Sequence, residues 1–144
     1  MLALTVKIAE IKEFMSKLLR SETFDEFDVK SVIIESFARV EVSAAASGER
    51  LRWTEIKPYI YDLIKRGQKP ILFKVVLALA QDEIEEKFIE AKALFINIIF
   101  ENGGVKITTG MAEKMFSLQR TTERAWDEYV RKLLDEKGVV FDEA

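Results

Sequence analysis

The chain has no cysteine and no histidine among its 144 residues. The missing cysteine excludes disulfides, thiolate nucleophiles and thiolate metal sites. The missing histidine removes the side chain best suited to proton transfer near neutral pH, so Ser-His-Asp and Cys-His chemistry and ordinary structural zinc are excluded within one chain. We therefore expect no catalytic triad, no metal site and no cofactor.

Glycine and proline are also scarce, with six and two residues, while 49% of the residues are hydrophobic and 33% are charged. This composition differs from that of disordered and low-complexity proteins. A chain of this length buries roughly two thirds of the surface that its unfolded form exposes. The sequence predicts a single folded domain over residues 1–144.

Positive charge is not in excess, because 22 Lys and Arg face 25 Asp and Glu, for a net charge of −3. We therefore expect no general affinity for DNA or RNA. The longest apolar run, "ILFKVVLALA", has ten residues and contains Lys74, whereas a spanning helix needs about twenty. The first residues, "MLALTVK", lack the charged leader of a signal peptide. We expect no membrane segment and a cytoplasmic protein.

Four segments have the apolar period of amphipathic helices, with capping residues at their ends. The first covers residues 8–19, with Thr5 as its start signal, and the second covers residues 54–66, with Thr54 as N-cap. A short helix over residues 81–93 is capped by Asp82, and a last helix runs from Thr121 to about Gly138.

Strand patterns lie between these helices. They predict a long strand over residues 29–46 with a bend at Ser36-Phe37, a central strand over 71–80, and strands over 94–100, 105–110 and 112–118. Because the order shows no regular β-α-β alternation, we predict an α+β fold. It would have a mainly antiparallel sheet of about five strands with three to four helices packed on it.

The stretch "FENGGVKITTG" at residues 100–110 contains glycines beside hydroxyls, as phosphate-binding loops do. A phosphate loop should open a helix, but the β-branched "VKIT" follows here. A two-residue turn at Asn102-Gly103 or Gly103-Gly104 instead places Ile98 and Val105 on one face of a hairpin. We predict a hairpin turn.

The other face of this hairpin carries Phe95, Asn97 and Ile99 on one strand and Lys106 and Thr108 on the next. Asn97, Lys106 and Thr108 are candidate polar anchors of a small-molecule pocket. Polar outward positions are also normal in antiparallel sheets, so a solvated face or a cross-strand pair is the alternative.

A second candidate site is the basic and aromatic group Arg50, Arg52 and Trp53, which could stack and pair with a nucleotide or single strand. Ordinary surface cations beside a packed tryptophan are the alternative. Two acidic clusters, at residues 22–28 and 82–90, lack the spacing of a calcium loop and are interpreted as solvated charge.

Four segments together resemble an uncharacterised bacterial family, a domain of unknown function in small proteins of anaerobic bacteria. They are "IKEFMSKLLRSETFDEF" (11–27), "IKPYIYDLIKRGQKP" (56–70), "LFINIIFENGGVKITTG" (94–110) and "AWDEYVRKL" (125–133). Members of that family carry a longer segment where this chain has "SAAASGERLRW", which leaves open whether the first strand is half of a hairpin. The resemblance implies a compact bacterial cytoplasmic protein and no particular activity.

These observations favour a non-catalytic binding or protein-interaction module. A homo-oligomer formed through a sheet edge or a helix face is one expectation for the partner. The alternative is a protein that binds small molecules, nucleotide-like ones included, or an enzyme that uses carboxylate or Lys chemistry.

Overall fold

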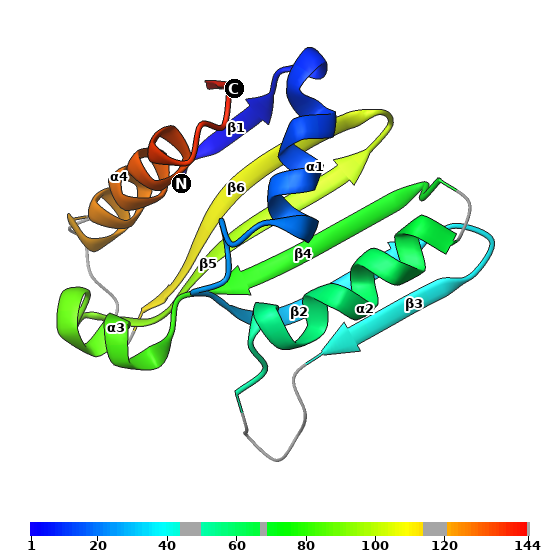
Figure 1. The fold of residues 1–144 in the computed structure, drawn as a ribbon. Coiled ribbons are helices and arrows are strands. Elements are labelled where there is room, and N and C mark those ends of the chain that lie inside the picture. The colour runs from blue at the N-terminus through cyan, green and yellow to red at the C-terminus, as the bar shows by residue number, and fades with distance from the viewer. Residues whose placement is uncertain (44–49, 67–68, 114–120, 144) are drawn as a thin grey trace.

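A seven-stranded antiparallel sheet forms the framework of the protein (Figure 1). The computed structural model describes residues 1–43, 50–66, 69–113 and 121–143. The strands are β1 (Ala3–Val6), β2 (Asp28–Glu35), β3 (Arg39–Ser43), β4 (Leu72–Ala78), β5 (Ala91–Glu101), β6 (Gly104–Glu113) and β7 (Phe141–Glu143). Their order is β3-β2-β4-β5-β6-β1-β7, and every described pairing is antiparallel. The predicted α+β class is confirmed, with seven strands instead of about five.

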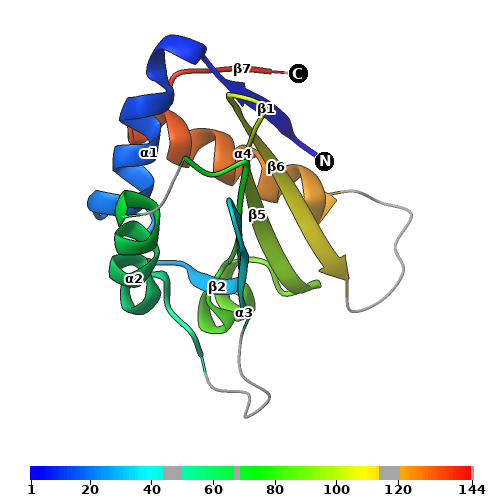
Figure 2. The same ribbon diagram turned by 90° about the vertical axis from the view of Figure 1, so that its right-hand side faces the viewer.

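Four α-helices in the described residues agree with the predicted three to four. They are α1 (Ile11–Arg20), α2 (Trp53–Arg66), α3 (Gln81–Lys87) and α4 (Thr121–Glu136), and a 3-10 turn, η1 (Ile8–Glu10), precedes α1. Figures 1 and 2 show α1, α2 and α4 against one face of the sheet and α3 near one end of it. None of these helices is long and apolar enough to cross a membrane.

The core lies between this helical layer and the sheet, because strand residues alternate between the two faces. On β4, Phe73, Val75 and Leu77 are buried toward the helices. Phe14 of α1 and Trp126 of α4 are 2% and 1% exposed and belong to the same hydrophobic cluster. Burying one such large apolar side chain stabilises the fold by about 1.5–3 kcal/mol.

The predicted long strand over residues 29–46 is wrong, because the chain reverses at the expected bend. Strands β2 and β3 form a hairpin in which Glu35 pairs with Arg39, and the N–H of Ser36 donates to the carbonyl of Ala38 at 3.1 Å. Apolar and polar residues alternate both before and after the turn. The sequence pattern of this hairpin is therefore the same as that of one long strand. Residues 44–46 lie outside the described part.

The predicted start of the first helix is also wrong, because Thr5 lies in strand β1 between β6 and β7. Neither β1 nor β7 was predicted, since each is short, with four and three residues. Similarly, α3 has Ala80 at its N-cap instead of Asp82. The predicted strand over 112–118 is only the end of β6, and residues 114–118 lie outside the described part.

The hairpin of β5 and β6 has the predicted two-residue turn at Asn102-Gly103. Both residues have positive φ, 54° and 74°, as a type I′ turn requires. Ile98 pairs with Ile107 and Phe100 with Val105 on the face toward the helices. The predicted hairpin turn is therefore confirmed, and Gly103 supplies one of its two positive φ angles.

The adjacent residues Thr108 and Thr109 face opposite sides of the sheet. Thr109 is 2% exposed; its hydroxyl donates to Asp127 Oδ1 of α4 at 2.6 Å and accepts from the N–H of Leu2 at 2.9 Å. The indole of Trp126 donates to the carbonyl of Phe95 at 3.0 Å. These bonds join α4 to the sheet.

Candidate functional site

The face of the sheet opposite the helices, here called the open face, is covered by no helix in the described part of the chain (Figure 2). It collects apolar and cationic side chains from strands β2, β4, β5 and β6. Its central residues are Lys30, Ile33, Lys74, Val76, Phe95, Asn97, Ile99, Lys106 and Thr108. The antiparallel register brings these residues together from positions up to 78 apart in the sequence, 30 to 108.

Two rows of cross-strand neighbours organise the open face. In the first, Ile33 pairs with Lys74, Lys74 with Ile99, and Ile99 with Lys106. Because adjacent strands lie about 4.8 Å apart, the backbones of Lys74 and Lys106 are roughly 10 Å apart. Ile33, Lys74 and Ile99 are half-buried. This row therefore alternates aliphatic and cationic groups.

The second row contains Val76, Asn97 and Thr108, which pair in that order across β4, β5 and β6. The amide of Asn97 donates to the hydroxyl of Thr108 at 3.2 Å. Asn97 and Thr108 are half-buried, and Val76 is 9% exposed although no described helix covers it. The side chains of this row thus shield one another from solvent.

Lys30 reaches the open face through an irregularity in β2. The register between β2 and β4 shifts between Val29 and Ser31, so Lys30 is the extra residue of a bulge. Its ammonium lies 4.4 Å from the centre of the Phe95 ring, two strands away. A cation over an aromatic ring at this distance is attracted by the ring's electron density.

The lysines of the open face are not neutralised within the described residues. None of the ion pairs there involves Lys30, Lys74 or Lys106. The nearby carboxylates of Asp28 and Glu35 pair instead with arginines at 2.9 and 2.7 Å. Glu101, two residues along β5 from Ile99, lies on the same face at the tip of the hairpin and also has no ion pair in the described residues, so three unpaired lysines and one unpaired carboxylate leave the face net cationic.

The structure brings the three predicted pocket residues, Asn97, Lys106 and Thr108, onto this one face. Asn97 and Thr108 bond to each other, and Lys106 lines an open hollow of about 380 Å³ at the tip of the hairpin. Thr5, Ile99, Glu101, Asn102, Gly104 and Val105 complete its lining. Lys30 and Lys74 were not predicted as site residues; the sequence signal for Lys74 is its place as the one polar residue of the apolar run at residues 71–80.

The predicted basic and aromatic group is divided between surface and interior. Trp53 is fully buried, and its indole donates to the carbonyl of Leu18 at 3.0 Å. Arg50 donates to both carboxylate oxygens of Asp28 at 3.0 Å, which raises the pKa of this arginine. Arg52 is exposed. The ring of Trp53 thus presents no free face beside the two arginines.

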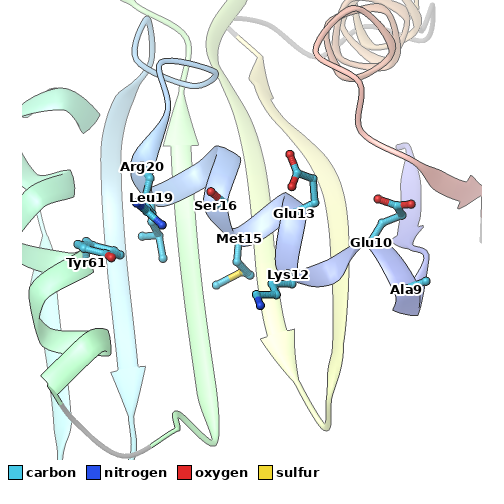
Figure 3. Close-up of a pocket in the computed structure, with 9 residues that line it drawn as sticks. All are labelled: Ala9, Glu10, Lys12, Glu13, Met15, Ser16, Leu19, Arg20 and Tyr61. Carbon is cyan, nitrogen blue, oxygen red and sulfur yellow. The ribbon is translucent and has the colours of Figure 1, made fainter.

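A larger groove runs along α1, and Tyr61 reaches it from α2 (Figure 3). Its volume is about 700 Å³, and Ala9, Glu10, Lys12, Glu13, Met15, Ser16, Leu19, Arg20 and Tyr61 line it. The Arg20 guanidinium lies 5.7 Å from the centre of the Tyr61 ring. Acidic and basic residues both line the groove, so its charge favours neither an anionic nor a cationic ligand.

The titratable groups of the described residues include no cluster that could hold a metal ion, and one of them has a strongly shifted pKa. No group of three or more Asp or Glu could hold a metal ion there. Burial raises the pKa of Tyr129 to about 12, and the carboxylates of Glu26, Glu83 and Glu136 add to this shift. A phenol with such a pKa stays neutral at physiological pH.

Comparison with known proteins gives a family but no function. The model of a family of unknown function, DUF5721, matches residues 17–142. No curated protein and no solved structure matches the chain. Since the match covers most of its length, the chain belongs to the DUF5721 family.

Proposed function

We propose that the protein is a non-catalytic binding module and that the open face binds a protein partner. The supporting observation is the row of Ile33, Lys74, Ile99 and Lys106, where half-buried aliphatic groups alternate with cations that have no ion-pair partner in the described residues. An antiparallel sheet with one solvated face normally carries polar residues there. Apolar groups at these positions favour a surface that a partner covers.

The bacterial cytoplasm is the proposed location. The resemblance to small bacterial proteins supports this proposal, and a chain without cysteine needs no oxidising compartment to form disulfides.

A photo-crosslinking amino acid at position 108 tests the binding surface, because Thr108 lies on the open face. The matched control places the same amino acid at position 132, since Lys132 is exposed on α4. In cells that naturally produce the protein, we expect a defined adduct from position 108 and none from position 132. Equal labelling from both positions, or none from position 108, would count against the proposal.

Small-molecule binding is the second candidate, favoured by the hollow beside Lys106. A metabolite thermal-shift screen separates the two functions, because a ligand of the native state raises its stability by mass action. A stabilising metabolite whose effect is lost in Lys106→Ala would favour the second candidate. If no metabolite raised the thermal stability of the protein, a protein partner would be favoured.

Self-association is a separate proposal that concerns the sheet edges. Strands β3 and β7 lie at the two edges, where unpaired backbone groups can pair with another chain. Light scattering after size exclusion tests it, because a mass of 16.6 kDa at all concentrations would contradict a homo-oligomer.

A further inference from the structure

We infer that the partner of the open face is an acidic amphipathic segment of another protein, with carboxylates placed opposite Lys74 and Lys106 and an aliphatic side chain opposite Ile99. This inference rests on the proposed function and adds the chemistry of the partner.

The positive charge of the open face determines the charge that its partner must carry. Lys30, Lys74 and Lys106 have no ion pair within the described residues, and Asp28 and Glu35 are held by arginines. Glu101 at the tip of the hairpin is the carboxylate of this face that has no ion pair among the described residues, so the three lysines outnumber it. A partner that buried these lysines without supplying carboxylates would leave cations desolvated and unpaired, which is costly. The partner must therefore be anionic at the centre of the contact.

The same charge argues against a second copy docked face to face. Such a contact would bring three lysines of one copy toward three of the other, and like charges across an interface destabilise it. The whole chain has a net charge of −3, so the cationic character belongs to this face and not to the molecule. A local cation cluster on an acidic protein selects a partner by its charge pattern.

The apolar groups favour a protein over a nucleic acid. Single-stranded nucleic acids bind sheet faces largely by stacking bases on exposed aromatic rings. The central part of the open face has one ring, Phe95, and the Lys30 ammonium already lies over it at 4.4 Å. Ile33, Val76 and Ile99 are aliphatic and offer no stacking surface, but they suit aliphatic side chains of a peptide.

The spacing of the lysines defines a probe. The backbones of Lys74 and Lys106 are roughly 10 Å apart, with Ile99 between them. Two carboxylates seven residues apart on a helix are also about 10 Å apart, with room for one apolar residue between them on the same face. An amphipathic peptide of Glu and Leu with this spacing, the acidic probe, matches the row.

Two double variants distinguish the effect of the lysines on the open face from the effect of the overall net charge. Lys74→Glu/Lys106→Glu reverses the central row, whereas Lys12→Glu/Lys132→Glu changes two exposed lysines on α1 and α4. Each Lys→Glu changes the charge by −2, so both variants go from −3 to −7. Circular dichroism and thermal unfolding show whether both remain folded.

Fluorescence anisotropy with the labelled acidic probe measures the affinity. We expect wild-type binding that weakens with added salt, a loss of about tenfold or more in Lys74→Glu/Lys106→Glu, and a change of less than about threefold in the control variant. Ile99→Ser should also weaken binding, because it removes the aliphatic contact between the two cations.

Other outcomes overturn the inference in different ways. No binding of the acidic probe, or an equal loss in both double variants, contradicts it. A labelled oligo-dT that binds more tightly than the acidic probe and is released by Lys74→Glu/Lys106→Glu assigns the face to a nucleic acid instead. If a probe with Gln in place of Glu binds equally well, the inference of an acidic partner is wrong, but the proposed binding function is not contradicted. The crosslinking at position 108 tests that function independently.

Discussion

The neighbouring threonines of β6 allow the two faces of the sheet to be compared with one chemical change. Thr109→Val and Thr108→Val both replace a hydroxyl by a methyl group of similar size. In Thr109→Val the N–H of Leu2, whose residue is 7% exposed, loses its acceptor, and Asp127 loses a donor at 2.6 Å. Leaving a buried donor unpaired costs about 1–3 kcal/mol.

The second bond lost in Thr109→Val adds less, because the Asp127 side chain is 16% exposed and can gain water. We take about 1 kcal/mol for it, so the variant should lose about 2–4 kcal/mol of unfolding free energy. In Thr108→Val the hydroxyl lost is half-buried and accepts one bond from Asn97 at 3.2 Å. Valine also suits a strand well, so this variant should lose less than about 1 kcal/mol.

Urea unfolding followed by circular dichroism measures both values on the same chain. The slope of unfolding free energy against urea should stay constant, because neither variant changes the area exposed on unfolding. If the two variants lost the same free energy within about 0.5 kcal/mol, the assignment of Thr109 to the buried bond network would be refuted.

Three further tests use substitutions in the turn, at a half-buried phenol and at one indole hydrogen bond. Gly103→Ala should cost about 1 kcal/mol in urea unfolding because φ is 74°, whereas Gly110→Ala should cost less, since its new Cβ meets other atoms at 3.7 Å. Between pH 10 and pH 12 the unfolded chain ionises Tyr129 before the folded chain does, so stability falls with rising pH. Denaturant midpoints should therefore fall more steeply in wild type than in Tyr129→Phe, and parallel curves would contradict the raised pKa. Trp53→Phe should cost about 2–4 kcal/mol in thermal unfolding, because the carbonyl of Leu18 loses its donor and the smaller ring leaves unfilled space at a fully buried position; an unchanged midpoint would contradict both effects.

Local patterns were sufficient to predict the hairpin of β5 and β6. Asn102-Gly103 specifies a two-residue turn, and the turn fixes which residues pair and which face each strand residue occupies. For this reason Asn97, Lys106 and Thr108 could be placed on one face from the sequence alone. That they bind a ligand stays a prediction.

Non-local pairing accounts for what the sequence did not reveal. Strand β1 is four residues long and exists because β6 and β7 pair with it, so its sequence alone carries no clear strand signal. The turn between β2 and β3 contains Ser36, Phe37 and Ala38 and lacks the Gly, Pro or Asn that usually marks a reversal. Lys30 joins the open face only through the order β2-β4-β5 and a bulge.

Because the main hydrophobic core lies on one side of the sheet, the two sides are subject to different constraints. Substitutions at Val75 or Ile98 must preserve packing against the helices, whereas those at Lys74 or Ile99 leave that packing intact. Within the family, the open face can thus change its chemistry while the framework stays the same. In a set of related sequences, positions along each central strand should then alternate between slow and fast amino-acid substitution, with the fast positions on the open face.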